Sequence, residues 1–207
     1  MNWKPKALVA AAGFALLALP AYSQTDRDPM ILLHIHQANQ DEIEMARLAK
    51  TNSSSQEVKN FAHQMIKDHK SAEAQVQTYA KNHKIDLDAV HRRLVETRDD
   101  RLELERRART IGSATGEWAF SWENTLRSNK SKHEAALGNL RKLNGAEFDR
   151  EFTRAMVEDH QAAIDQLLSA RSDASDSEVR NLIDELLPTF RQHLSMAQKL
   201  SDAVSKA

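Results

Sequence analysis

Apolar residues recur along most of the chain at spacings of three and four, the period of an amphipathic α-helix. After Asp28-Pro29, which suits a helix start, the pattern runs through residues 29 to 50. Similar patterns cover about 55 to 82 and 146 to 170, and a last helix from about 175 to 200 contains Pro188. The sequence therefore predicts four long helices, each with one buried face.

Residues 86 to 143 have a different pattern. The first part, 86 to 110, is rich in charge and carries Glu-Arg pairs at i,i+4, which favours an exposed helix. After Gly112 and Gly116, a second helix carries Trp118 and Trp122, which we expect to anchor it on the other helices, and Asn144-Gly145 is typical of its end. We interpret 86–143 as an inserted helical segment.

Two serines are predicted to cap helices. Ser54-x-x-Glu57 and Ser175-x-x-Glu178 both match the capping box, in which serine and glutamate side chains satisfy backbone amides of the first turn. We therefore expect helices to begin directly after Ser54 and Ser175.

A short segment occurs twice, 91 residues apart. The first copy, Phe61-x-x-x-Met65-x-x-Asp68-His69-x-x-Ala72-x-x-Gln75, matches the second at six positions over 152–166. Apolar matches are common between amphipathic helices, but a repeated Asp-His at the same phase is more specific. The repeat indicates two related helical hairpins.

Composition supports the same fold class. The 207 residues include only five glycines and four prolines, too few for the turns of a β fold. We predict an all-α, ferritin-like four-helix bundle with an inserted helical hairpin, forming a single domain over residues 24–207.

The N-terminus resembles a signal peptide. Lys4 and Lys6 precede an apolar run from Ala7 to Leu19, which is too short to span a bilayer, and a cleavage site follows at Ser23. We predict a signal peptide over 1–23 and a periplasmic or secreted protein without stable membrane insertion after cleavage; an uncleaved anchor is the alternative.

Charge and cysteine content exclude several classes of function. The 29 basic and 30 acidic residues give a net charge of −1, which argues against nucleic acid as a partner. The chain has no cysteine, so any metal must be bound by nitrogen and oxygen. No phosphate-binding loop, nucleophile elbow or His-Glu-x-x-His motif is present, which favours a protein without catalysis.

Each of the four long helices places one group able to bind a metal on its apolar face: Glu42, His69, His160 and His193. Buried ionisable groups are costly unless they are paired or bound to a metal. These four residues are the predicted ligands of a transition metal ion such as Fe, Mn, Zn or Cu, with Asp68 and Asp159 as additional ligands or as acceptors that orient the histidine rings.

A hydrogen-bonded Glu-His-His-His network without metal is the alternative. The Glu-x-x-His pattern of ferritin-type di-iron sites is missing, because Ile66, Val157 and Phe190 stand three positions before the three histidines. The remaining histidines are expected at the surface: His34, His36, His63, His83, His91 and His133.

Several motifs resemble one bacterial family. They are Asn39-x-x-Glu42-Ile43, Asp68-His69 and Leu187-Pro188-x-x-x-x-His193-Leu194, and they are similar to the family called domain of unknown function 4142. That resemblance implies a ferritin-like, exported protein without an established activity. It covers about 30–83 and 144–204 and leaves 86–143 as roughly forty extra residues.

Two functions from different classes follow. In the first, the protein has an envelope or stress-related role and acts by interaction, with 86–143 contacting a second copy or an envelope protein partner. In the second, it is a ferritin-like protein that binds or stores a transition metal through Glu and His from four helices.

Overall fold

A computed structural model describes residues 27–96 and 114–206 of the chain. Within these ranges the protein consists of helices and short connections and has no strand, which confirms the all-α prediction. The helices are α1 (Arg27–Asn52), α2 (Gln56–Asn82), α3 (Leu87–Glu96), α5 (Ala114–Leu140), α6 (Gly145–Asp173) and α7 (Ser177–Val204).

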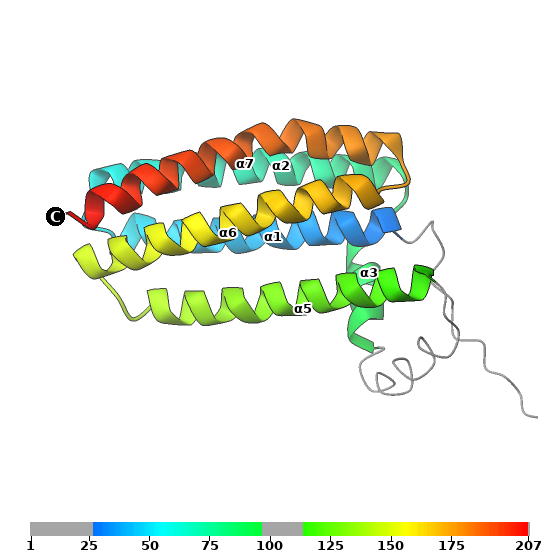
Figure 1. Cartoon of the computed structure of the whole chain (residues 1–207), viewed down its shortest axis with the longest axis horizontal. Helices are drawn as coiled ribbons and strands as arrows, with labels where there is room; N and C mark the ends of the chain where they lie inside the picture. Colours follow the sequence, from blue (N-terminus) through cyan, green and yellow to red (C-terminus); the bar gives the residue numbers. More distant parts are fainter. Residues whose placement is uncertain (1–26, 97–113, 207) are drawn as a thin grey trace, which may run out of the picture.

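Four long helices form the central bundle (Figure 1). Helix α1 packs along α2 and α6 along α7, and the two hairpins meet through α1 with α6 and α2 with α7. Helix α5 lies along α1 and α6, on the side away from α2 and α7, and α3 packs on α1. The bundle matches the predicted helix-on-helix architecture, while its ferritin-like character stays a prediction.

The bundle interior has two apolar clusters with a polar layer between them. One cluster joins the start of α1 and α7 to the end of α2 and α6, and the other joins the opposite ends of the same helices. Near the middle of each of the four helices, buried polar residues interrupt the buried apolar positions. The buried polar residues at these interruptions are Asn39, Glu42, His69, His160 and His193.

The loops at the two hairpin turns are held by matching carboxylates. Asp149 of α6 accepts hydrogen bonds from the backbone N–H of Ser54 and Ser55 and from the Ser54 hydroxyl, at 3.2, 3.1 and 2.8 Å. Asp28 of α1 accepts from the corresponding groups of the other loop, the backbone N–H groups of Ser175 and Asp176 and the Ser175 hydroxyl. Each hairpin thus supplies an aspartate that forms hydrogen bonds with the loop of the other hairpin.

These ties explain why the predicted caps are wrong by one residue. Ser55, not Ser54, caps α2 and accepts from the Val58 amide, and Asp176, not Ser175, caps α7 and accepts from the Glu178 amide. The serines before them are occupied by Asp149 and Asp28, a tertiary contact that local sequence does not reveal.

Helix α5 docks through an aromatic contact. Trp122 is 6% exposed, donates to Asp173 at 3.1 Å and packs edge-on against His34, with ring centroids 5.5 Å apart. This confirms Trp122 as an anchor and corrects the surface placement of His34, which is 5% exposed because α5 covers it. Burial lowers the pKa of His34 to about 4.

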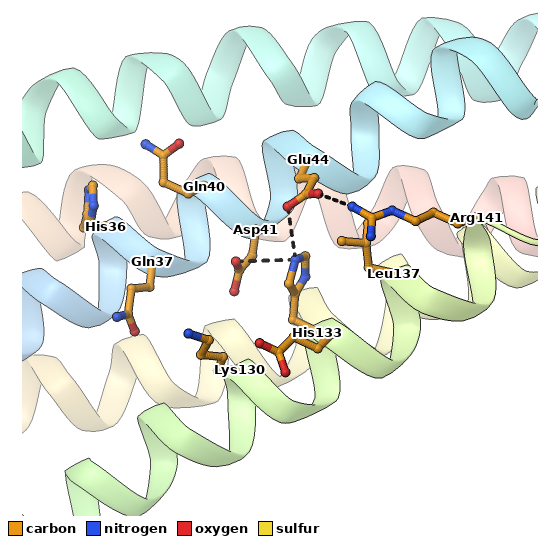
Figure 2. Close-up of a pocket in the computed structure, with 10 residues that line it drawn as sticks. His36, Gln37, Gln40, Asp41, Glu44, Lys130, His133, Leu137 and Arg141 are labelled. Carbon is orange, nitrogen blue, oxygen red and sulfur yellow. Dashed lines mark hydrogen bonds and ion pairs between the residues drawn. The ribbon is translucent and has the colours of Figure 1, made fainter. Parts of the chain in front are cut away.

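A polar groove runs between α1 and α5 (Figure 2). His133 of α5 lies between Asp41 and Glu44 of α1, with Nε2 3.4 Å from Asp41 Oδ1 and 3.9 Å from Glu44 Oε2, and Arg141 pairs with Glu44 at 2.7 Å. The His133 side chain is only 10% exposed, so its predicted surface position is also wrong. We call the region around His133, Asp41, Glu44 and Arg141 the α1–α5 groove.

Several sequence predictions fall outside the described residues. The signal peptide at 1–23 and part of the segment 86–143 are among them. The described part of that segment supplies α3 and α5, and α5 ends at Leu140, while Asn144 precedes the first residue of α6 instead of closing α5. Within the described residues, no helix combines the length and hydrophobicity needed to cross a membrane.

Candidate metal centre

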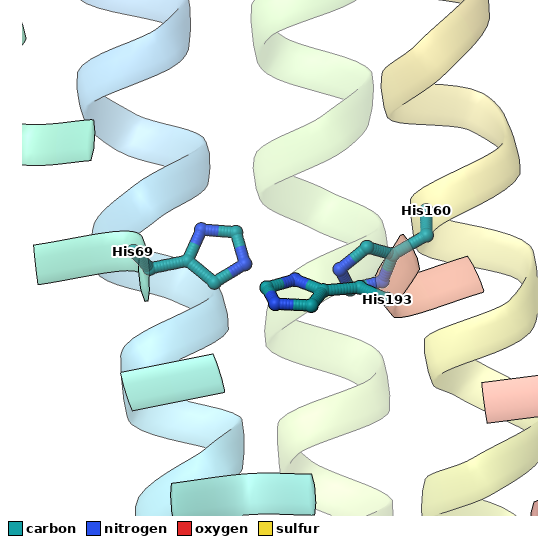
Figure 3. A group of neighbouring side chains, drawn as sticks. All are labelled: His69, His160 and His193. Carbon is teal, nitrogen blue, oxygen red and sulfur yellow. The ribbon is translucent and has the colours of Figure 1, made fainter. Parts of the chain in front are cut away.

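Three histidines meet in the polar layer of the bundle. His69 of α2, His160 of α6 and His193 of α7 point toward one another (Figure 3), and one ring nitrogen of each lies within 4.8 Å of those of the other two. Their exposed fractions are 1%, 0% and 0%. We call these three residues the tri-histidine centre.

The helical repeat explains two of the three positions. His69 and His160 each follow a buried phenylalanine by eight residues, and those phenylalanines, Phe61 and Phe152, also contact each other edge-on at 6.3 Å. Eight residues are slightly more than two helical turns, so histidine and phenylalanine share a face. The third histidine, His193, comes from α7 and stacks edge-on against Phe61 at 6.1 Å.

One nitrogen of every ring is held by an oxygen. His69 Nδ1 donates to Asn39 Oδ1 at 3.0 Å, His160 Nδ1 to the Met156 carbonyl at 2.9 Å, and His193 Nε2 to Asp68 Oδ2 at 3.0 Å. Because each partner is an acceptor, the proton of each neutral ring lies on the bonded nitrogen. The tautomer and the orientation of all three rings are thereby fixed.

The other nitrogen of every ring has no hydrogen-bond partner. These atoms are His69 Nε2, His160 Nε2 and His193 Nδ1, all buried. A buried polar atom without a partner costs about 1–3 kcal/mol, and native proteins contain few of them. The three rings that point toward one another thus each contain one unsatisfied nitrogen, so the tri-histidine centre gathers three such atoms in the described core.

Electrostatics keep these rings neutral. Burial lowers the pKa of His69 well below its usual range, and the neighbouring His160 and His193 lower it further. Burial, with His193 beside it, lowers the pKa of His160 to about 3. Burial also lowers the pKa of His193, while Asp68 partly opposes the effect. Neutral imidazole is the form that binds a metal ion.

Glu42 lies beside the centre but on its outer side. Its Oε1 is 4.0 Å from His160 Nδ1, the nitrogen already bonded to the Met156 carbonyl, and its Oε2 has no partner. Burial raises the pKa of Glu42 well above its usual range, and the nearby Asp159 and Asp41 raise it further. Glu42 is inward-facing as the periodicity predicts, yet the compact group of ligand atoms consists of the histidines alone.

The two flanking aspartates have different surroundings. Asp68 orients a histidine, and that histidine belongs to the neighbouring helix α7. Asp159 instead interacts electrostatically with His133 and Asp41 of the α1–α5 groove; burial raises its carboxyl pKa to about 6, and His133 partly opposes this shift. The structure therefore brings Asp68, and not Asp159, to the tri-histidine centre.

Sequence reasoning assigned no role to Asn39. This residue is fully buried and fixes the ring of His69. The sequence does contain an indication of this role, because Asn39 lies one turn before Glu42 on the apolar face of its helix, where an amide side chain is unusual. The Met156 carbonyl carries no such signal, because every residue has one.

The chain matches a protein-family model over most of its length. The family model described as Domain of unknown function (DUF4142) matches residues 16–200. The chain belongs to the DUF4142 family. No curated protein and no solved structure matches it. DUF4142 membership confirms the resemblance drawn from the Asp-His and Leu-Pro motifs, and by its description it brings no activity with it.

Because the DUF4142 description gives no activity, we infer the function of this chain from the geometry of the tri-histidine centre. Histidines that bind metals commonly donate their second ring N–H to a carboxylate, a backbone carbonyl or another acceptor. The tri-histidine centre has one such acceptor for each ring. Three neutral imidazoles held in this way are a donor set for a single cation with room for a further ligand.

Proposed function

We propose that this protein binds one transition metal ion through His69, His160 and His193. The observations that carry the proposal are three buried rings that point toward one another, with one ring nitrogen of each within 4.8 Å of those of the other two, and on every ring one nitrogen held by a hydrogen bond and one without a partner. A cation would satisfy all three lone pairs at once and would offset the cost of burying them.

Three imidazole ligands limit which metal ions the centre would bind. Three imidazoles suit Zn²⁺, Cu²⁺ and Fe²⁺, whereas Mn²⁺ favours carboxylate and water oxygens. Three nitrogens around a tetrahedral zinc ion, each at about 2.0–2.1 Å from it, lie about 3.4 Å apart. The nitrogens here lie within 4.8 Å of one another, so binding would draw the rings together. Among the metals considered from sequence, Zn²⁺ and Cu²⁺ fit best.

Glu42 and Asp159 have supporting positions in this proposal. Glu42 sits behind His160, and its raised pKa favours the neutral acid, which is a poor ligand. The proposal therefore assigns binding to the histidines, ring orientation to Asn39 and Asp68, and no direct contact with the ion to Glu42 or Asp159. The role that fits a fully buried ion is binding, buffering or storage of metal, in an exported protein if residues 1–23 are a signal peptide.

The interaction hypothesis has less support from the geometry. Protein-binding surfaces often contain contiguous exposed apolar patches. Among the described residues, the large apolar side chain that stands out as exposed is Leu168 on α6, at 44%. The described helices of 86–143 use Trp122, Leu126 and Leu137 to pack on the bundle itself.

A zinc titration tests the proposal. Tag-free, chelator-treated protein is titrated with Zn²⁺ in competition with a chromophoric chelator. We expect about one equivalent in the wild type, and loss of that equivalent in His69→Gln and in His160→Gln, which keep a polar side chain but remove the imidazole. His63→Gln is the matched control, because His63 is an exposed histidine on the same helix as His69.

Binding below about 0.1 equivalent in the wild type, or equal binding in the His69→Gln, His160→Gln double variant, would overturn the proposal. Circular dichroism of each variant shows whether the helices are retained, so that loss of metal is not confused with loss of the fold.

A further inference from the structure

A small groove lies between α2 and α7, over the tri-histidine centre. Its volume is about 100 Å³. Ser71 and Gln75 of α2 and Glu185 of α7 form its exposed rim, and the buried side chains of Ala72, Leu186 and Phe190 form its walls. We call it the α2–α7 groove.

Two residues that line this groove connect it to the tri-histidine centre. His69 lines it, is 1% exposed and has an unpartnered Nε2. Asp68 also lines it, and its side chain is 21% exposed while its Oδ2 accepts the hydrogen bond from His193. Asp68 is thus in contact with solvent on one side and with a ring of the centre on the other.

In the described part of the chain, two other directions around the centre, along the bundle axis and toward α5, show no groove that reaches the three histidines. Along the bundle axis, the two apolar clusters lie above and below the polar layer. The α1–α5 groove is larger, about 370 Å³, but none of the three histidines lines it. Its three carboxylates, Asp41, Glu44 and Glu134, are partly neutralised by Lys130 and Arg141, which weakens its attraction for a cation.

We propose that the α2–α7 groove is the access route by which a divalent metal ion reaches the tri-histidine centre, with Glu185 at its mouth and Asp68 as the residue that passes the ion inward. This inference rests on the proposed function and adds to it the path and the residues that control the rate of binding. On this route the carboxylate of Asp68 would take a partly hydrated cation from the groove, and the imidazoles would then replace its remaining waters.

Charge and size both support this route. Two carboxylates in a narrow, partly apolar groove raise the local concentration of cations and the rate of their association. The acids are not balanced by a lysine or arginine among the residues that line the groove. A partly hydrated ion fits this groove, since a volume of about 100 Å³ corresponds to about three waters at about 30 Å³ each.

Stopped-flow kinetics test the route. Metal-free protein is mixed with Zn²⁺ and a fluorescent zinc indicator to measure uptake, and zinc-loaded protein is mixed with excess chelator to measure release. Two variants act on the groove: Ser71→Phe adds bulk at an exposed rim position, and Glu185→Gln removes the charge at the mouth. Glu134→Gln is the matched control, an exposed acid that lines the α1–α5 groove.

The expected result is that Ser71→Phe slows uptake and release alike, by at least about fivefold, and leaves the equilibrium affinity unchanged, because it alters the path and not the ligands. Glu185→Gln should slow uptake by about threefold at low salt, with the difference shrinking at high salt. Glu134→Gln should match the wild type.

Failure of the route and failure of the proposed function are distinguishable. If the wild type and both groove variants bind one equivalent of Zn²⁺ with the same uptake and release rates, the route is wrong and the metal centre stands. If the wild type takes up no Zn²⁺ at equilibrium, the proposed function is wrong and the route falls with it. Glu185→Gln keeps the test available if Ser71→Phe disturbs the helices.

Discussion

Helix α1 faces two clusters of polar side chains, each containing histidine, that have opposite electrostatic character. On its inner side, Asn39 and Glu42 lie next to three imidazoles, with a single carboxylate, Asp68, bonded to one ring. On its outer side, Asp41 and Glu44 lie next to one imidazole, His133, together with Arg141. The inner side of α1 therefore has more imidazoles than charged groups beside it, whereas the outer side has more charged groups than imidazoles.

The difference shows what a histidine needs in order to be a ligand. In the tri-histidine centre, burial keeps the rings neutral and an acceptor on one nitrogen leaves a lone pair on the other. In the α1–α5 groove, His133 lies at ion-pair distance from two carboxylates, and neither of its ring nitrogens has a hydrogen-bond partner that would fix the tautomer or the orientation of the ring. Histidine content alone therefore does not locate the metal site.

The largest expected effect that separates the two clusters is stabilisation by zinc. A ligand present at a thousand times its dissociation constant stabilises the folded state by about 4.1 kcal/mol. We expect a shift of this size for the wild type and for His133→Gln, and none for His69→Gln. Urea unfolding with and without Zn²⁺ measures it. Equal stabilisation of His69→Gln would place the bound ion elsewhere.

A smaller effect is expected at Asp68. Replacing an acceptor that orients a metal-binding histidine typically weakens metal affinity 10–100-fold. We expect Asp68→Asn to weaken Zn²⁺ binding by this factor with the stoichiometry unchanged, because His193 keeps its place but loses a charged acceptor. Competition titration gives the value. Asp159→Asn is the control, since Asp159 interacts electrostatically with His133 and Asp41 of the outer cluster, and it should leave the affinity unchanged.

The smallest effect concerns pH in the metal-free protein. The unfolded chain protonates a histidine near pH 6.5, whereas folded His160 has its pKa lowered to about 3. The unfolded state therefore binds more protons as the pH falls, and His160 reduces stability by about 1.4 kcal/mol between pH 7.5 and 5.5. Asp159 has the opposite effect on stability. Burial raises its carboxyl pKa in the folded state to about 6, so the folded state takes up this proton before the unfolded chain does, and stability rises as the pH falls.

His160→Leu isolates this contribution. Its stability relative to the wild type should rise by about 1.4 kcal/mol between pH 7.5 and 5.5, as measured by urea unfolding in the presence of a chelator. Because the variant also removes a buried nitrogen without a partner, it should be at least as stable as the metal-free wild type at pH 7.5. Parallel pH profiles would show that His160 is not held neutral in the fold.

Helical periodicity was sufficient to predict the inward faces. Glu42, His69, His160 and His193 all interrupt apolar stripes, and all four are buried. The repeat at 91 residues also placed His69 and His160 at equivalent positions. Periodicity works here because each helix of a bundle has one buried face, so the phase of a residue determines its burial.

Contacts between distant helices could not be predicted in this way. His34 and His133 were expected at the surface because their burial depends on how α5 docks on α1. The caps at Ser54 and Ser175 shifted by one residue because Asp149 and Asp28, far away in sequence, bind those serines. The separation of Glu42 from the histidine group likewise depends on the rotation of α1 against α6.

X-ray absorption spectroscopy of the zinc-loaded protein tests the central claim most directly. The protein is loaded with one equivalent of Zn²⁺, desalted and measured at the zinc edge. The account predicts three imidazole nitrogens at about 2.0–2.1 Å, with the multiple scattering of imidazole rings, and one further light-atom ligand. A shell dominated by carboxylate or water oxygen, or loss of the zinc on desalting, would contradict it.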